Sequence, residues 1–324
     1  MRKNLKVDFC DFWAYFDKTD NFFFKSLSKK YNLLISDDPD ILIYSCFGND
    51  HLKYKCVKIF YTGENKVSDF YACDYSISFE DNNNPRQFKL PYYAFRLLEL
   101  DSINELLKPK THEEASLIWK NKSKFSSFVI SNAKAKERIS FFEKLSLYKR
   151  VESGGRYLNN VGGPIKDKIQ FISQYKFNIA FENERFPGYL TEKIVDAFLA
   201  NTIPIYWGDP LISKVFNENK FINVSHYSSY EEVIEKIKII ENDEVLAINM
   251  LCEPVFENVL PNELNLSKFE NFLFGIIENK NKIKPVSRTW RRYVCIFKYG
   301  KKTFEKNVKR LIMKTTRFLK FLIL

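Results

Sequence analysis

The stretch from Tyr175 to Pro210 constrains the fold of this chain more than any other part of the sequence. It begins with the short apolar run Phe177–Phe181, which predicts a buried strand. A helix is predicted from about Leu190, because apolar residues recur there at helical spacing, and Ile203–Tyr206 predicts a second strand. Strand, loop, helix and strand in this order indicate a βαβ unit and therefore a parallel sheet.

The loop between this strand and this helix lies where parallel sheets bind ligands, because helix N-termini present free N–H groups beyond the carboxyl ends of the strands. It carries more hydrogen-bonding side chains than a connection needs: Glu182, Asn183, Tyr189, Thr191, Glu192 and Lys193. A carboxylate next to an amine suits a sugar hydroxyl and a phosphate, respectively. The alternative is that Glu192 complements the helix dipole and Lys193 is solvated.

Two other segments contain candidate site residues. Ile59–Asn65 ends a predicted strand with a glycine turn and Glu64, which by itself is an ordinary loop acid. Phe125–Ile130 predicts another strand, and a helix follows it with three cations near its N-terminal end: Lys134, Lys136 and Arg138. Cations are unfavourable at the positive end of the helix dipole, but at this position they can bind a diphosphate. The alternative interpretation is that these three side chains form a solvated basic face.

Length and composition favour a compact α/β protein. A chain of 324 residues can form two medium-sized domains, and 45% hydrophobic residues exclude general disorder. Short apolar runs typical of strands precede residue 62: Lys6–Trp13, Tyr31–Ile35, Ile41–Ser45 and Lys58–Tyr61. Leu97–Lys124 is less patterned, and Glu152–Arg156 indicates a mobile loop. The last predicted helices are Tyr230–Ile240, Asp243–Glu257 and Leu266–Asn279.

The six cysteines include no CxxC pair, and most adjoin apolar runs. This pattern predicts buried thiols in a reducing compartment. The three histidines are scattered without a ligand spacing, so no dedicated zinc site is expected. The first residues lack the sustained apolar core of a secretory signal, and no run approaches the ~20 apolar residues that span a bilayer. The main body is expected in the cytosol.

The formal charge of +11 belongs to the C-terminal tail. Residues 284–324 contain 13 Lys or Arg and one acid, whereas the first 283 residues contain 38 basic and 39 acidic side chains. Apolar residues recur in the tail at spacings of three or four, which predicts a basic amphipathic helix suited to an anionic membrane surface. A helix that packs on a partner or on the core is the alternative, and nucleic acid is not an expected partner.

Three segments together resemble the bacterial α1,3/4-fucosyltransferases of glycosyltransferase family 10. FENERFPGYLTEKIVDAFLANTIPIYWGDP resembles the donor-binding motif of that family, in which Leu190 replaces the usual Val and the insert Glu184–Gly188 differs most. FYTGEN, which ends at Asn65, and FVISNAKAKERISFF, which contains Arg138, resemble two further motifs in the order of the family. The resemblance covers about residues 57–280.

The resemblance implies a GT-B fold, in which two Rossmann-like α/β domains face a cleft. The expected divisions are residues 1–124 for the acceptor-binding domain, 125–283 for the GDP-fucose-binding domain and 284–324 for the membrane-association tail. The implied reaction is inverting transfer of L-fucose from GDP-fucose to the 3-hydroxyl (or 4-hydroxyl) of N-acetylglucosamine in an N-acetyllactosamine-type glycan. Products would be Lewis-antigen-like structures, as in a lipopolysaccharide O-antigen.

In this interpretation Glu64 is the catalytic base, and Arg138 and Lys193 stabilise the charge that develops on the departing GDP. The other expected GDP-fucose contacts are Asn183, Tyr189 and Glu192. No metal is required because the cations can stabilise the leaving group, although added Mn²⁺ could assist. The enzyme is expected on the inner face of the cytoplasmic membrane. Alternatives are another GT-B enzyme with a different nucleotide sugar, or a non-catalytic membrane-surface protein.

Overall fold

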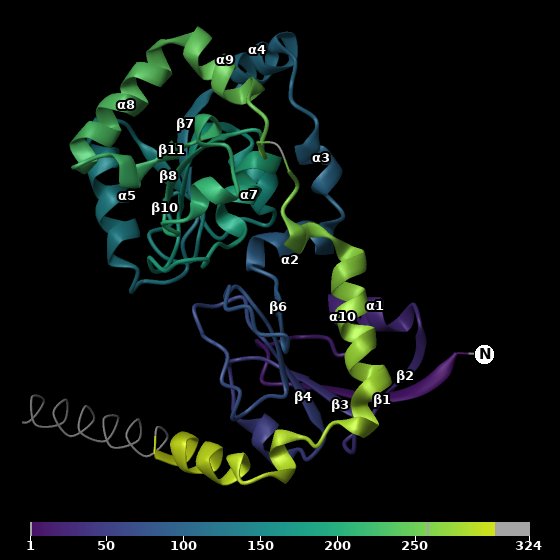
Figure 1. Ribbon diagram of the computed structural model, residues 1–324. Coiled ribbons are helices and arrows are strands. Elements are labelled where there is room, and N and C mark those ends of the chain that lie inside the picture. The colour runs from purple at the N-terminus through teal and green to yellow at the C-terminus, as the bar shows by residue number, and fades with distance from the viewer. Residues whose placement is uncertain (1, 258, 302–324) are drawn as a thin grey trace, which may run out of the picture.

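The computed structural model describes residues 2–257 and 259–301 of the chain (Figure 1). Its described strands form two fully parallel sheets, one of six strands in the order β2-β1-β3-β4-β5-β6 and one of five in the order β11-β10-β9-β7-β8. We call the parts built on these sheets the N-terminal and the C-terminal domain. The predicted α/β class is confirmed. Most of the predicted tail helix, residues 302–324, lies outside the described part.

The N-terminal sheet has its middle strands covered on both faces. All residues of β3 and β4 are buried, which explains why these strands are apolar except for Lys58. The strands of this sheet are β1 (Lys3–Cys10), β2 (Tyr31–Ile35), β3 (Ile41–Tyr44), β4 (Val57–Tyr61), β5 (Tyr75–Ser78) and β6 (Gln87–Lys89). Helices α1 (Phe22–Ser28) and α2 (Tyr92–Leu100) pack in the same core.

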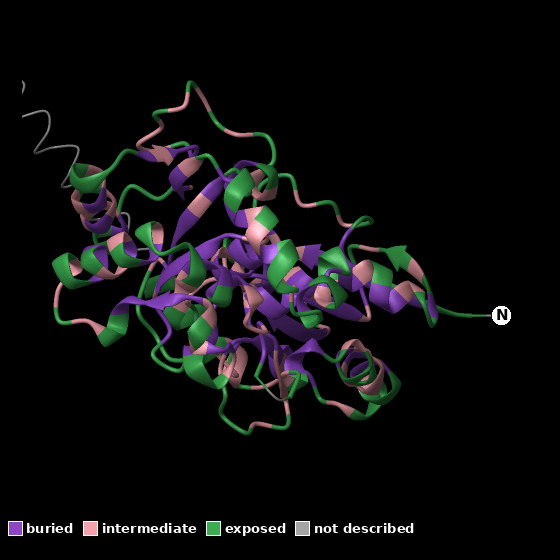
Figure 2. Ribbon diagram, turned by 90° about the horizontal axis from the view of Figure 1, so that it is seen from above, coloured by how far each residue is buried: buried purple, intermediate pink, exposed green. Residues whose placement is uncertain are grey.

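The C-terminal sheet contains the predicted βαβ unit. β9 pairs with β10 along its length, so that Ala180 lies opposite Tyr206, and α7 connects them. The strands are β7 (Lys124–Phe128), β8 (Val151–Ser153), β9 (Tyr175–Phe181), β10 (Ile203–Trp207) and β11 (Ile222–Asn223). The helices are α4 (His112–Asn121), α5 (Lys136–Tyr148), α6 (Lys168–Ile172), α7 (Glu192–Leu199), α8 (Tyr230–Asn242) and α9 (Glu244–Cys252). Figure 2 shows buried residues concentrated in the strands and exposed residues on the outer helices.

Helix α10 (Leu266–Asn279) returns to the N-terminal domain and runs beside α1 (Figure 1). The ring of Phe269 stacks on Phe22 with centroids 5.0 Å apart, and Leu273 and Ile276 are buried in the same core. The second sheet begins at Lys124, next to the expected domain boundary, but the expected C-terminal domain extended to residue 283. Because the buried side chains of residues 266–279 lie in the core of the first sheet, this helix packs as part of the N-terminal domain.

The two domains share one apolar core along the side of α2 and α7. Leu190, Ile194 and Val195 at the start of α7 belong to the same buried cluster as Tyr93 of α2. The Tyr93 amide also donates a hydrogen bond to the carbonyl of Leu190 at 3.2 Å. This contact fixes the two sheets relative to each other on one side and leaves a cleft beside it.

Three local predictions differ from the structure. The weakly patterned Leu97–Lys124 contains α3 (Ile103–Leu107) and α4, whose N-terminus is closed by a capping box of Thr111 and Glu114. The helix expected to reach residue 257 ends at Cys252, because Glu253 precedes a proline and takes an extended conformation. Glu152 and Ser153 lie on β8 instead of in a loop.

The described start of the tail packs on the N-terminal domain. The Val286 amide donates a hydrogen bond to Asp74 Oδ1 at 2.7 Å, and Cys295, on a helix over residues 291–301, is buried. All six cysteines are free, but only Cys73 and Cys295 are fully buried, which corrects the expectation that all of them are. Among the described helices, none is long and apolar enough to cross a membrane.

Candidate active site

A cleft of about 540 Å³ lies between the two domains, on the side where β4, β7 and β9 end. This volume is typical of a site for a small molecule or a nucleotide. Both domains contribute to its lining: Trp13, Phe47, Tyr61, Gly63, Glu64, Tyr92 and Arg96 from the first, and Val129, Ser131, Asn132, Arg138, Lys168, Asn183, Tyr189, Thr191, Glu192, Lys193 and Asp196 from the second. All six predicted site residues are among them.

Glu64 is held on the N-terminal side of the cleft by the turn after β4. Its amide donates a hydrogen bond to Thr62 Oγ1 at 3.0 Å. Gly63 packs so closely on the ring of Tyr92 that a Cβ atom would lie 2.8 Å from Tyr92 Cδ2, so a larger residue would displace the turn. Burial raises the pKa of the Glu64 carboxyl, and Lys193 on the opposite side lowers it in part. Its pKa therefore lies above that of an exposed glutamate.

Arg138 and Asn183 meet on the opposite side of the cleft. Arg138 is only 4% exposed, and its Nη1 donates a hydrogen bond to Asn183 Oδ1 at 2.9 Å while its Nη2 donates to the carbonyl of Val129 at 3.0 Å. Burial lowers the pKa of this guanidinium. Within the described residues its Nε has no hydrogen-bond partner. A cation that lines a cleft is suited to an anionic ligand.

Glu182, at the end of β9, organises the start of α7. Its fully buried carboxylate accepts hydrogen bonds from the Thr191 amide at 2.7 Å and the Thr191 hydroxyl at 2.6 Å. Lys193 Nζ lies 3.0 Å from Glu182 Oε2 and 2.8 Å from Thr191 Oγ1. Thr191 is the N-cap residue, but its hydroxyl donates to Glu182 and does not cap the helix. Lys193 is thus held in one position at the N-terminus of α7.

An ionic network that the sequence analysis missed lies beneath these residues. Lys168 Nζ is 2.7 Å from Asp196 Oδ2 and 3.3 Å from Glu192 Oε1, and Arg96 Nε of α2 is 3.5 Å from Asp196 Oδ1. Burial opposes the charge of Glu192, but Lys193 and Lys168 hold the pKa of its carboxyl well below the usual range. Glu192 and Asp196 are four residues apart and share one face of α7, and this spacing could have indicated the acidic part of the network from the sequence. Neither Lys168 nor Arg96 belongs to a local motif.

Tyr189 is buried between the cleft and the N-terminal domain. It is 2% exposed, and its ring lies edge-on to that of Phe79 with centroids 5.6 Å apart. Burial raises the pKa of its phenol, so this group stays a neutral donor. The other two cations predicted beside Arg138 are different: Lys134 and Lys136 are exposed and do not line the cleft.

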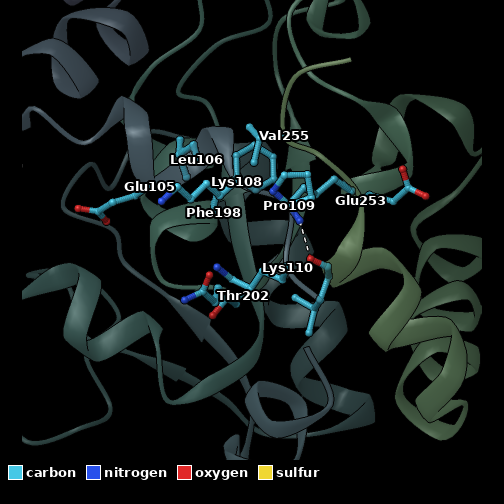
Figure 3. Close-up of a pocket in the computed structure, with 12 residues that line it drawn as sticks. Glu105, Leu106, Lys108, Pro109, Lys110, Phe198, Thr202, Glu253 and Val255 are labelled. Atoms are coloured by element: carbon cyan, nitrogen blue, oxygen red, sulfur yellow. Dashed lines mark hydrogen bonds between the residues drawn. The ribbon is translucent and has the colours of Figure 1, made fainter. Parts of the chain in front are cut away.

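A second cavity lies at the opposite end of α7, and segments 105–110 and 251–255 contribute to its lining (Figure 3). Phe198, Thr202, Lys110 and Val255 are among the residues that line it. Its volume of about 20 Å³ is enough for one water molecule and too small for a nucleotide. Within residues 2–257 and 259–301, no three or more His, Cys, Asp or Glu side chains gather in a group that could hold a metal ion.

Two parts of the chain match parts of one enzyme family. Residues 7–96 match the family described as "Alpha-(1,3)-fucosyltransferase FucT N-terminal domain". Residues 119–248 match "Glycosyltransferase family 10 (fucosyltransferase) C-term". Each match includes one of the two sheets, except that the first four residues of β1, Lys3–Lys6, precede the first match. The two matches occur in the order of the two domains.

The chain is also similar to individual family members. It is 33% identical over 291 residues to "Alpha-(1,3)-fucosyltransferase FucT" of Helicobacter pylori, covering 78% of this chain and 61% of that protein. A crystal structure of an α1,3-fucosyltransferase with GDP matches with a TM-score of 0.72 and 28% identity, over 86% of this chain and 91% of that one. A structure with GDP-fucose matches with a TM-score of 0.70 and 29% identity, over 86% and 92%.

The chain spans about three fifths of the length of the H. pylori relative. The two parallel sheets and the cleft between them match the solved fucosyltransferases over most of both chains, which confirms the predicted GT-B fold. Both of its domains match the same family, in the same order, and the three motifs singled out in the sequence lie within those matches. The chain belongs to the fucosyltransferases of glycosyltransferase family 10.

Proposed function

We propose that this protein transfers L-fucose from GDP-fucose, with inversion, to the 3-hydroxyl (or 4-hydroxyl) of N-acetylglucosamine in an N-acetyllactosamine-type glycan. One observation carries the proposal: Glu64 of one domain and Arg138 and Lys193 of the other line the same cleft. A carboxylate facing two cations is the arrangement that a single displacement of a nucleotide from a sugar requires, with a base on one side and a charge-stabilising group on the other.

The acceptor side of this reaction needs a base at the attacking hydroxyl. Glu64 is half-buried, and its raised pKa brings its basicity closer to neutral pH than that of an exposed glutamate. In the proposed step the Glu64 carboxylate accepts the hydroxyl proton as the new glycosidic C–O bond forms. The bond between the fucosyl carbon and the diphosphate oxygen breaks at the same time, through an oxocarbenium-like transition state.

The donor side needs groups that stabilise the negative charge growing on GDP. The guanidinium of Arg138 and the amine of Lys193 are the proposed diphosphate contacts. Both lie close to helix N-termini, of α5 and α7, which also favour negative charge. Glu192, Asn183 and Tyr189 are the proposed contacts of sugar and ribose hydroxyls. No metal is needed in this scheme, and Mn²⁺ would only assist.

The proposed linkage is based on the similarity to the H. pylori protein, which is described as an α-(1,3)-fucosyltransferase. The proposed donor is based on the similarity to the solved structure with GDP-fucose. The test is to incubate the purified full chain with GDP-fucose and both lacto-type disaccharides, and to locate the new bond by NMR. A panel of GDP- and UDP-sugars in parallel identifies the alternative GT-B enzyme with another donor. Transfer from a different nucleotide sugar, or release of no GDP at all, would reject the proposal.

The proposal also places the enzyme on an anionic membrane surface, at the cytoplasmic face, where it would build Lewis-type or O-antigen glycans. Its support is the basic tail and three exposed aromatic residues at its described start: Trp290, Tyr293 and Phe297. Because residues 286–299 are bonded to the N-terminal domain, the test removes only the residues after Lys301. We expect this truncation to weaken sedimentation with phosphatidylglycerol vesicles and to preserve transfer to soluble acceptors. If the truncated protein sediments with the vesicles as the full chain does, the removed residues are not the membrane contact.

A further inference from the structure

Two aromatic rings on the N-terminal side of the cleft have no part in the proposed chemistry. Trp13 is 44% exposed and Phe47 is 53% exposed, and both line the cleft together with Glu64. Their ring centroids are 6.5 Å apart and their planes are nearly perpendicular. We call this pair the aromatic wall. Exposed aromatic area in a binding cleft is unfavourable in water unless a ligand covers it.

The Trp13 side of the aromatic wall rests on packed rings. Trp13 packs edge-on against Phe16 at 5.3 Å between centroids, and Phe16 stacks on Phe12 at 3.9 Å. Phe12 in turn stacks on Tyr61, the last residue of β4, three positions before Glu64. This chain of contacts links Trp13 to the strand that presents the proposed base. The position of Trp13 relative to Glu64 is therefore set by the packing of these rings.

The Phe47 side is fixed by the carboxylate of Asp11. Asp11 accepts hydrogen bonds from the amides of Asp50 at 2.8 Å and His51 at 3.0 Å, and its carbonyl accepts one from the amide of Phe47 at 2.9 Å. His51 Nδ1 lies 2.6 Å from the same carboxylate. A Cβ atom at Gly48 would lie 2.3 Å from Asp11 Oδ1, so a larger residue there would displace this carboxylate. The loop that carries Phe47 is preorganised, as a binding surface requires.

The charge of the two sides decides which ligand the aromatic wall fits. The cations proposed for the diphosphate, Arg138 and Lys193, come from the C-terminal domain. The aromatic wall comes from the domain that carries the proposed base, and Trp13 and Phe47 are themselves uncharged. It therefore suits a neutral ligand with a flat apolar face on the acceptor side. In a β-galactose ring, the C–H groups at carbons 3, 4 and 5 point to one face and form such a surface.

We propose that Trp13 and Phe47 form the subsite for the galactose that neighbours the fucosylated N-acetylglucosamine, with the apolar face of galactose packed on the aromatic wall. The inference rests on the proposed fucosyl transfer and specifies how its acceptor is recognised. Trp13 and Phe47 are specificity-determining residues in this scheme, because a monosaccharide acceptor would not reach the aromatic wall. The base and the diphosphate contacts would act in the same way on either acceptor.

The test compares acceptor kinetics of Trp13→Ala and Phe47→Ala with those of the full-length wild type. We expect each variant to raise the KM for N-acetyllactosamine about tenfold, the loss expected for one buried sugar face. The KM for GDP-fucose and the KM for free N-acetylglucosamine should change less than twofold. Trp13→Phe should restore most of the affinity. Tyr15→Ala is the matched control, because Tyr15 is fully exposed, two residues from Trp13, and does not line the cleft.

Saturation-transfer NMR on the GDP-loaded protein separates this inference from the proposed function. We expect saturation at galactose H3, H4 and H5, and its loss in Trp13→Ala. This result would support the subsite even if the wild type transferred no fucose, which would reject the proposed function alone. An unchanged disaccharide KM in both variants, an equal rise for the monosaccharide, a galactose signal that persists in Trp13→Ala, or no glycan binding to the wild type would each overturn the inference.

Discussion

Lys193 Nζ lies 3.0 Å from Oε2 of Glu182, a carboxylate with no exposed surface. The cation that we propose for the diphosphate is therefore positioned before any ligand binds, by an acid that directly follows β9. Such preorganisation avoids the cost of ordering a flexible lysine when the transition state forms. It also makes Glu182 a positioning residue whose loss affects the fold and the site together.

Glu182→Gln should lower the free energy of unfolding by about 3 kcal/mol, because an amide cannot replace a buried carboxylate that accepts from Thr191 and Lys193. Urea denaturation followed by circular dichroism measures this change. Glu184→Gln is the matched control two residues away, where the side chain is exposed and a change within about 0.5 kcal/mol is expected. Equal midpoints for the two variants would contradict the organising role of Glu182.

The pH profile of fucosyl transfer should report Glu64. A base acts in its deprotonated form, so kcat/KM should fall as the pH falls through the pKa of Glu64. Because burial raises that pKa above 4.5, the acidic limb should lie above pH 4.5. Glu64→Gln should reduce kcat by about 10²–10⁴-fold and leave GDP affinity, measured by calorimetry, within twofold. Near-normal turnover in this variant would remove Glu64 as the base.

Arg138→Lys should weaken GDP binding although it keeps the positive charge. The guanidinium contacts Asn183 and Val129 at once, and a lysine amine cannot reproduce that planar fork. We expect a rise of about tenfold or more in the Kd of GDP by calorimetry, from the loss of a charge-assisted hydrogen bond. Lys136→Ala on the same helical turn removes an exposed cation and should leave the Kd unchanged. Similar affinities for both variants would place the diphosphate elsewhere.

Lys122 should make stability depend on pH in the alkaline range. Its amine is buried and donates to the carbonyls of Ser173 and Ala200 and to the hydroxyl of Thr202, and burial lowers its pKa from 10.5 to about 8. Between pH 8 and 10.5 the unfolded chain binds this proton more tightly than the folded one, so stability rises with pH by up to about 3 kcal/mol. The urea midpoint of the wild type should rise over this interval relative to that of Lys122→Met. Urea midpoints of the two proteins that change in parallel with pH would contradict this prediction.

A chelator should leave the reaction largely intact. In the proposed site, Arg138, Lys193 and two helix N-termini supply the positive charge that a metal would otherwise provide at the diphosphate. We expect EDTA-treated protein to keep most of its initial rate of GDP release with acceptor present, and added Mn²⁺ to raise that rate by a few-fold at most. Complete loss on chelation, restored by Mn²⁺, would show that the cations alone are insufficient.

The sequence was most informative where structure depends on neighbours along the chain. Helical spacing predicted α10 at its observed bounds, Leu266–Asn279, because one apolar face of a helix must be buried wherever the helix packs. It failed between residues 97 and 124, where two short helices have weak periodicity and a cap defines one of them. The expected helix end at 257 was five residues too late, since the proline that stops the helix was not weighed.

By itself the sequence determined the βαβ unit at the centre of the C-terminal sheet and the identity of the six candidate side chains, because both depend on local pattern and motif. Only the tertiary structure decided that Glu64 shares a cleft with Lys193, that Lys168 and Arg96 meet Asp196, and that Trp13 lines the same cleft as Glu64. These partners are far apart along the chain or belong to different elements. Their contacts arise from the packing of α7 and α2 in a common core, which no periodicity within either segment encodes.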